Sequence, residues 1–449
     1  MTDLTSTDTF AGGLAGALTG RLLRPGDAAF DRAATPWNLA VHQPVAAVVE
    51  AADADDVVAT VRHARAAGRA VAAQSTGHGA TGDTADAVLL RTGRLDRVEV
   101  DPATRTARVG AGASWRSVQA AAVPHGLTGL LGSAPGVGVA GYTLGGGLGW
   151  FSRAHGLAAD HVRSFDVVDA AGEPGTVTAD SDGELFWALR GGGGDLAVVT
   201  AMEIGLEPVP AFSGGKLAWP AERAAEVLDV FRAVTATAPA GLSVWLSRVE
   251  APGAPAVVVV HAAHLGDAPE ARALLRPFAA VPGVLGPGVD AAIGPVGLAD
   301  VGDITADPTD PAAGRSRAEL LTGVDGPEVE RLFTSSVAPL LLLQLRHLGG
   351  ALAHPGPDAG ALGAIAEPYL LYGFGLAFEP GLAAAVGDRL AALPAELAGA
   401  ATGRKPATFL APGERAAAAY DDAALARLTD LKRSRDPQGT IRGAYPLLG

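Results

Sequence analysis

A glycine-rich loop that follows a short apolar run constrains this chain more than any other segment. Residues 74–82 read Gln-Ser-Thr-Gly-His-Gly-Ala-Thr-Gly, so one histidine, His78, stands among three glycines. Glycine has no Cβ, and the backbone N–H groups of such a loop can therefore close around an anion. The preceding residues, 70–73, are strand-like and lead the chain into the loop. The sequence therefore predicts an anion-binding loop at the end of a strand.

Two further glycine-rich segments follow in order along the chain. Residues 138–149 read Gly-Val-Ala-Gly-Tyr-Thr-Leu-Gly-Gly-Gly-Leu-Gly, and residues 182–194 read Asp-Gly-Glu-Leu-Phe-Trp-Ala-Leu-Arg-Gly-Gly-Gly-Gly. Together with the histidine loop, these segments resemble the FAD domain of the berberine-bridge-enzyme-like flavoprotein oxidases, within the vanillyl-alcohol-oxidase superfamily. The resemblance covers roughly residues 40–207.

The resemblance implies an FAD-dependent oxidoreductase. In that family the loop histidine, matched here by His78, carries the flavin through a covalent bond to its 8α carbon. Some relatives add a second bond through a cysteine, but Ala134 stands at that position and the chain has no cysteine. The FAD-binding residues implied are Gln74, Ser75, Thr76, Gly77, His78, Gly79, Gly138, Gly141, Tyr142, Thr143, Gly145, Gly146, Gly149 and Val199.

Two alternative interpretations of these glycines carry less weight. Taken alone, a histidine between glycines is more often a turn residue than a cofactor attachment. Residues 136–141 also fit G-x-G-x-x-G, with Asp160 about twenty residues later, as in nicotinamide-binding folds. Residues 129–135 make a poor strand before that string, however, and the glycines at 145–147 weaken any helix after it. The sequence therefore predicts FAD and no nicotinamide site.

The pattern of elements predicts an α+β fold. Residues 44–73 alternate as strand, helix and strand. From about residue 208 the sequence pattern changes to longer helices between strand-like runs. With the resemblance, this predicts a PCMH-type two-subdomain FAD-binding lobe plus an antiparallel-sheet substrate lobe covered by helices. The expected domains are an FAD-binding domain at 1–207, a substrate-binding domain at 208–404, and a C-terminal segment at 405–449 that returns to the FAD domain.

Composition and charge exclude several classes of binding partner. The chain has 449 residues, 48% hydrophobic and 18% charged, with a net charge of −14. A nucleic-acid partner is not expected, because neutralising phosphates requires a basic face. No apolar run is long enough for a membrane span, no histidines have metal-ligand spacing, and residues 1–5 lack signal-peptide character. We expect a cytoplasmic bacterial protein, as monomer or homodimer, without metal.

Tyrosines are the candidates for acid–base chemistry. Tyr445 stands where many relatives have a histidine near the C-terminus, and Tyr369 lies in a strand of the expected substrate lobe. The chain departs from the family at Asp195, commonly asparagine, at Ala197, commonly glycine, and at Ala444, commonly asparagine. These departures weaken the case for ordinary oxidase turnover more than the case for flavin binding.

The function predicted is oxidation of a C–OH or C–NH bond of a small molecule, a secondary metabolite or a sugar, with molecular oxygen accepting the electrons. Tyr445 or Tyr369 would take the substrate proton as the hydride leaves. A flavin-containing cyclase of a natural-product pathway, with no net redox change, is the alternative. A binding protein that has lost catalysis is a third possibility.

Overall fold

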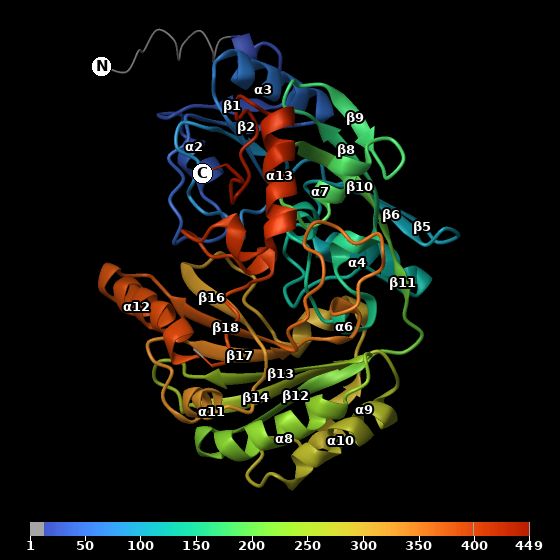
Figure 1. Ribbon diagram of the computed structural model, residues 1–449, viewed down its shortest axis with the longest axis vertical. Helices are drawn as coiled ribbons and strands as arrows, with labels where there is room; N and C mark the ends of the chain where they lie inside the picture. Colours follow the sequence, from blue (N-terminus) through green and yellow to red (C-terminus); the bar gives the residue numbers. More distant parts are fainter. Residues whose placement is uncertain (1–12, 398, 449) are drawn as a thin grey trace.

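The computed structural model describes residues 13–397 and 399–448, so the prediction about residues 1–5 lies outside the described residues. Figure 1 shows two lobes. The N-terminal lobe contains a four-stranded and a five-stranded sheet, and the other, here called the sheet lobe, contains a seven-stranded sheet. This arrangement confirms the expected α+β class.

The four-stranded sheet delivers the histidine loop. It comprises β1 (Arg21–Leu23), β2 (Ala47–Glu50), β4 (Val88–Arg91) and β3 (Val71–Gln74), in that order. Strands β2 and β3 both run parallel to β4, and α3 (Ala54–Ala66) connects β2 to β3. The Asp53 side chain accepts a hydrogen bond from the Asp56 N–H and so caps α3, as carboxylates do at helix starts. The predicted strand–helix–strand unit is confirmed.

The five-stranded sheet is antiparallel and completes the N-terminal lobe. Its order is β5 (Val98–Asp101), β6 (Thr106–Gly110), β10 (Val198–Gly205), β8 (Val162–Val168) and β9 (Pro174–Val177). Helices α4 (Trp115–Ala122) and α7 (Gly183–Leu189) belong to this lobe, and the Ser114 side chain caps α4. A short pair, β7 (Leu127–Thr128) with β11 (Glu207–Pro208), lies where the chain leaves the lobe.

The seven-stranded sheet is antiparallel throughout and forms the sheet lobe. Its order is β15 (Ile293–Pro295), β12 (Ser213–Pro220), β14 (Val257–His264), β13 (Leu242–Val249), β17 (Leu342–His347), β18 (Tyr369–Leu376) and β16 (Gly314–Leu321). Strands β12 and β16 were missed by the sequence analysis, because glycines at 214 and 215 and charges at 315, 317 and 319 break the apolar pattern.

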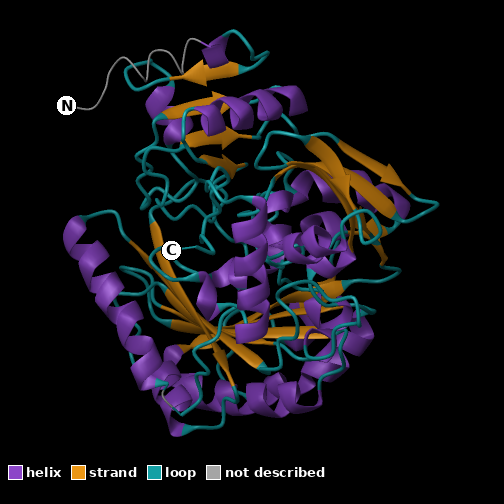
Figure 2. Cartoon of the chain, turned by 45° about the horizontal axis from the view of Figure 1, so that its top comes forward, coloured by secondary structure: helices purple, strands orange, loops and turns teal. Residues whose placement is uncertain are grey.

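Helices cover one face of this sheet, as predicted. They are α8 (Ala224–Thr237), α9 (Ala268–Leu275), α10 (Val289–Ala292), α11 (Pro327–Thr334) and α12 (Pro380–Glu396). Figures 1 and 2 show these helices on the side of the sheet away from the N-terminal lobe, and their apolar side chains and one face of the strands make a single core. The opposite, inner face shares a core with the N-terminal lobe.

The end of the chain lies against the N-terminal lobe. Helix α13 (Asp422–Arg435) packs beside α7, where Arg427 forms an ion pair with Glu184 at 2.6 Å. After α13 the backbone runs alongside β3, because the Val71 N–H donates to the Thr440 carbonyl at 2.7 Å. The tail therefore lies next to the strand that leads into the histidine loop.

Candidate FAD site

The start of the histidine loop is held by side chains of β4 and of the segment before β2. The Gln74 amide donates to Gln43 Oε1 at 2.6 Å and accepts from Arg91 at 3.2 Å. Gly77 has φ +79°, and a Cβ there would lie 2.8 Å from the Cβ of Pro36. Only glycine fits that backbone without displacing its neighbour. The loop is therefore set in place by packing.

His78 is oriented by two neighbours. Thr76 Oγ1 lies 2.8 Å from His78 Nδ1, and the Trp37 ring stacks on the imidazole with centroids 4.2 Å apart at 15°. Burial lowers the pKa of His78 to about 4, so the imidazole is neutral at physiological pH. No hydrogen bond reaches Nε2 from any residue that the structure describes. His78 thus combines a fixed, neutral ring with one free nitrogen, as a nucleophilic tether requires.

The second glycine segment adjoins this loop. A Cβ at Gly138 would lie 2.9 Å from Ser75 Oγ, so the backbone there approaches the loop as closely as glycine permits. Helix α5 (Val139–Leu144) follows directly. An added Cβ at Gly79 or Gly141 would meet no protein atom within 4 Å, so each borders open space. The two segments that the resemblance assigns to FAD are therefore in contact, and each retains room for a ligand.

Two polar groups in α5 have no protein partner. Tyr142 Oη and Thr143 Oγ1 are buried, and neither makes a hydrogen bond with a described residue. Tyr142 packs edge-on against Trp115, with centroids 5.6 Å apart. Buried polar atoms are usually paired, so these orphan hydroxyls fit a segment that is completed by a polar ligand.

The remaining glycines of the second segment are explained by packing. A Cβ at Gly149 would lie 2.0 Å from the Leu131 carbonyl oxygen, and one at Gly145 would lie 2.9 Å from Thr408 Cγ2. Gly146 has φ +102° and lies against Leu362. Val199 is buried in β10. Their predicted contacts with FAD stay predictions.

The third segment connects the second segment to the tail. After α7, the Gly193 N–H donates to the Leu144 carbonyl at 2.8 Å, and the Tyr420 hydroxyl donates to the Gly191 carbonyl at 3.0 Å.

The geometry of the second glycine segment does not favour the nicotinamide alternative, because α5 is six residues long and follows no strand of the two larger N-terminal sheets.

Asp195 has a structural role that the sequence analysis missed. Its carboxylate is 2% exposed and accepts hydrogen bonds from the Gly443 N–H at 2.7 Å and the Leu447 N–H at 3.0 Å. Lys432 Nζ lies 3.6 Å from the same carboxylate and also pairs with Asp436. An aspartate in place of the usual asparagine is thus explained by its contacts with the tail. The basic residue Lys432 near the end of α13 was a sequence signal that a buried carboxylate would lie opposite it.

The two tyrosines proposed for acid–base chemistry lie in different places. The Tyr445 hydroxyl donates to the Leu410 carbonyl, and burial together with Glu414 raises the pKa of Tyr445 above its usual value. Tyr369 is on the helix-covered face of β18, where its hydroxyl lies 2.7 Å from Thr235 Oγ1. Burial also raises the pKa of Tyr369. The assignment of either as the base stays a prediction.

The inner face of the seven-stranded sheet carries polar and aromatic residues to which sequence analysis gave no role. Trp245 of β13 stacks on Trp150 of the N-terminal lobe, with centroids 3.5 Å apart at 11°. The Arg346 guanidinium lies 4.0 Å from the Trp245 ring centroid and 5.4 Å from that of Tyr372. These side chains come from strands that meet only through sheet pairing, so no local signal could have grouped them.

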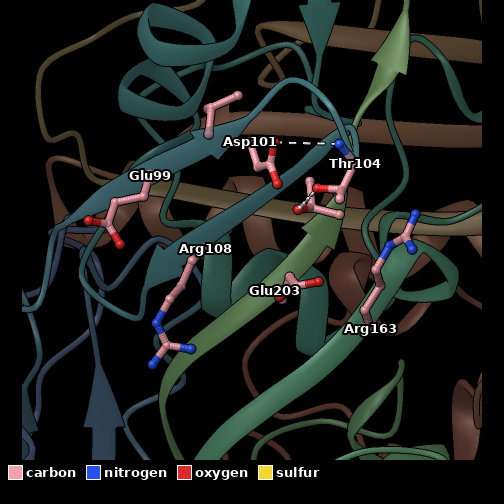
Figure 3. Close-up of a pocket in the computed structure, with 8 residues that line it drawn as sticks. Glu99, Asp101, Thr104, Arg108, Arg163 and Glu203 are labelled. Carbon is pink, nitrogen blue, oxygen red and sulfur yellow. Dashed lines mark hydrogen bonds between the residues drawn. The ribbon is translucent and has the colours of Figure 1, made fainter.

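A hollow of about 400 Å³ lies elsewhere, on the five-stranded sheet (Figure 3). Asp101 there accepts a hydrogen bond from the Thr104 N–H at 3.5 Å and from the Ala103 N–H at 2.9 Å, as in an ordinary Asx turn. The lining residues are Glu99, Val100, Asp101, Thr104, Thr106, Arg108, Arg163 and Glu203. It includes no residue of the glycine segments.

Two further observations concern the described residues. In the parts of the chain that the structure describes, no group of three or more His, Asp or Glu side chains is arranged to hold a metal ion. No helix within 13–397 or 399–448 is long and apolar enough to cross a membrane.

Comparison with known proteins identifies an FAD binding domain in the N-terminal lobe. Residues 45–178 match the FAD binding domain family. The chain is 31% identical over 196 residues to (R)-6-hydroxynicotine oxidase of Paenarthrobacter nicotinovorans. The aligned region covers 43% of each protein. The matched region thus spans less than half the length of that curated relative.

Solved structures extend the similarity to the whole chain. The fold matches wild-type BBE-like 1 of Physcomitrella patens with a TM-score of 0.85, 20% identity and 99% of each chain covered. It also matches 6-hydroxy-D-nicotine oxidase of Arthrobacter nicotinovorans, with a TM-score of 0.81, 22% identity, and 95% and 97% of the chains covered. The chain therefore contains an FAD binding domain at residues 45–178, and as a whole it has the PCMH-type fold of these BBE-like structures.

Proposed function

We propose that this protein is an FAD-dependent oxidoreductase whose flavin is covalently attached to His78 through the 8α position. The observation that carries the proposal is the state of His78: neutral, stacked on Trp37, bound at Nδ1 by Thr76, and free at Nε2. The loop that carries His78 contacts the second glycine segment at Gly138, and Gly79 and Gly141 border open space.

The chain's own residues would hold and orient the cofactor. When bound, FAD supplies the two-electron chemistry, while the protein contributes position and electrostatics. Backbone of the loop at 77–79 and of the segment at 138–141 would take the phosphates. Thr76 and Trp37 would fix the plane of the His78 ring, and Gln74 with Arg91 would hold the base of the loop.

The substrate would bind against the inner face of the seven-stranded sheet. The stacked pair Trp150 and Trp245 joins the two lobes there and would exclude water from one side. A substrate C–OH or C–NH group must lose a proton as its hydride leaves, and Tyr445 is the proposed acceptor. Tyr369, the other predicted candidate, lies on the helix-covered face of the sheet, away from a substrate bound here. Since burial raises the pKa of Tyr445, the phenol carries its own proton at neutral pH, and it would have to release that proton as it takes the proton of the substrate.

The substrate class and electron acceptor follow by analogy. One relative is named a nicotine oxidase, and another, 33% identical over 173 residues, is named xylooligosaccharide oxidase. We propose a secondary metabolite or sugar as substrate and molecular oxygen as acceptor. The proposed setting is a cytoplasmic bacterial protein, monomer or homodimer, divided at residues 207 and 404 as predicted.

A flavin-containing cyclase remains the second candidate. It was motivated by the departures at Asp195, Ala197 and Ala444. Asp195 now has a structural explanation in docking the tail, which removes one of these reasons. Ala197 is buried in the N-terminal core. The remaining support for a cyclase is the alanine at residue 197 and the missing asparagine at residue 444.

A substrate screen with a hydrogen peroxide readout tests the proposal. The purified yellow protein is supplied with alcohols, amines and sugars, and peroxide formation is expected with at least one class. Photoreduction followed by admission of air provides a substrate-independent measurement. Rapid recovery of the oxidised flavin spectrum supports an oxidase, whereas a reduced flavin that persists in air would contradict oxygen as the acceptor.

A further inference from the structure

A buried guanidinium on the inner sheet face has no anionic partner. Arg346 of β17 is 8% exposed, and its Nε donates to Gln344 Oε1 at 2.7 Å. Its Nη atoms make no hydrogen bond, and the side chain makes no ion pair, with any residue the structure describes. Burying a charge without an ion pair is costly, so an arginine with free donors in this position indicates a missing partner.

Aromatic rings surround this guanidinium. Its Cζ lies 4.0 Å from the Trp245 ring centroid, 5.1 Å from that of Phe409 and 5.4 Å from that of Tyr372. Ring faces attract a cation and lie flat against a guanidinium plane, but they accept none of its in-plane N–H donors. The donors therefore remain available to a ligand that enters between the rings.

A second unpartnered polar group lies on the same face of the sheet, in line with Arg346 across neighbouring strands. Strand pairing sets Trp245 opposite Arg346 on one side and opposite His261 of β14 on the other. His261 is 8% exposed and its Nδ1 is buried without a partner. Lys216 is paired with His261 on the next strand, so the row carries two cations and an imidazole. Asp307 is the acidic group that partly offsets the Arg346 charge.

This row lies at the boundary between the lobes. Trp245 stacks on Trp150, which directly follows the second glycine segment. Phe409 is preceded by Thr408, whose N–H donates to the Gly145 carbonyl at 3.1 Å. The unpartnered donors are thus adjacent to the segment proposed to hold FAD.

We propose that the substrate of this protein is an aromatic carboxylic acid, whose carboxylate is bound by the Nη donors of Arg346 with His261 as a second donor. The inference rests on the proposed function and adds the substrate class. A planar carboxylate matches the two parallel donors of a guanidinium, and the surrounding rings suit an aromatic body. Because the chain as a whole carries a charge of −14, only a local cationic group can favour an anion here.

Equilibrium binding to the purified holoprotein tests this, with benzoate and benzamide as probes. They share shape and ring and differ in charge. We expect calorimetry to show saturable benzoate binding at least about tenfold tighter than benzamide binding, since bonds to charged groups exceed neutral ones. Arg346→Gln should weaken benzoate binding by about 10–100-fold and leave benzamide unchanged, and Arg346→Lys should recover part of the loss. Arg163→Gln, on the exposed five-stranded sheet, is the matched control.

Equal affinity for the two probes in the wild type would overturn the proposal, and this comparison does not depend on any variant folding. Wild-type benzoate affinity in Arg346→Gln, with normal flavin content, would overturn it as well. The readout is independent of turnover. Selective benzoate binding without peroxide formation from any substrate would contradict the proposed oxidase and leave the carboxylate site standing, whereas oxidation of neutral substrates without benzoate selectivity would do the reverse.

Discussion

Arg153 joins the two lobes, and replacing it tests how that joint is stabilised. The side chain is buried, and its guanidinium donates to four carbonyls of the sheet lobe: Leu348 at 3.0 Å, Leu242 at 2.8 Å, and Pro239 and Ala238 at 3.3 Å. Burial lowers the pKa of Arg153 to about 10, so it remains charged at neutral pH. Two of the acceptors, on Leu348 and Leu242, form fully buried hydrogen bonds.

Arg153→Met keeps most of the side-chain volume and removes all four bonds. Each buried carbonyl left without its partner costs about 1–3 kcal/mol, and the relief of a buried charge offsets part of the total. We therefore expect a loss of about 3 kcal/mol in the free energy of unfolding, measured by urea titration at pH 7. Arg153→Lys should fall between, because an ammonium cannot reach four separate carbonyls.

The control is Arg427→Met, since Arg427 forms an exposed ion pair with Glu184. A pair of that kind contributes about 0–1 kcal/mol. If Arg153→Met unfolds within about 0.5 kcal/mol of the wild type, the carbonyl bonds contribute little net stability and the reasoning is refuted.

Three other predictions concern the site and the pH response. Gly77→Val and Gly79→Val should both lower flavin content, but only Gly77→Val should destabilise the flavin-free protein, because only there does a Cβ meet protein atoms; equal melting temperatures would contradict this. Burial lowers the pKa of His347 to about 3, so the folded protein favours the neutral imidazole. The stabilisation of the folded state by neutral His347 is therefore complete above pH 6.5 and is lost as the pH falls toward 3. His347→Gln should therefore reduce the loss of stability between pH 6.5 and 4 by up to about 3 kcal/mol, and exposed His354→Gln should not; identical acid profiles would refute the shift. Tyr445→Phe should keep flavin content and lower turnover by about 10²–10⁴-fold if the phenol accepts the proton, whereas unchanged turnover would assign Tyr445 to packing.

Local sequence signals were sufficient for the N-terminal lobe. The caps at Asp53 and Ser114, the strand before the loop and the hairpin at 98–110 all depend on neighbours within a few residues. Helix α5 was not expected, because the glycines at 145–147 argue against a helix, and the structure ends the helix at Leu144 just before them. The glycines at 145–147 therefore explain both why the helix ends at Leu144 and why the sequence did not predict it.

The inner sheet face could not be predicted from the sequence. Arg346, Trp245 and His261 become neighbours through the register of three strands that are widely separated in the chain. The same holds for Asp195, whose carboxylate accepts hydrogen bonds from tail residues that are about 250 positions later in the sequence. Long-range pairing leaves no periodic signal at such positions, so only the type of residue, an arginine or aspartate in an apolar context, gave a hint.

The central claim, that His78 carries the flavin, is tested most directly by peptide mass mapping of the acid-denatured protein. A single FAD adduct is expected, on the peptide that contains His78, and it should be absent from His78→Ala. Thr76→Val, which removes the hydroxyl next to Nδ1, should lower the fraction of modified peptide, and Thr76→Ser should preserve it. Release of all the flavin from the wild-type chain on denaturation, or an adduct on any other peptide, would contradict the account.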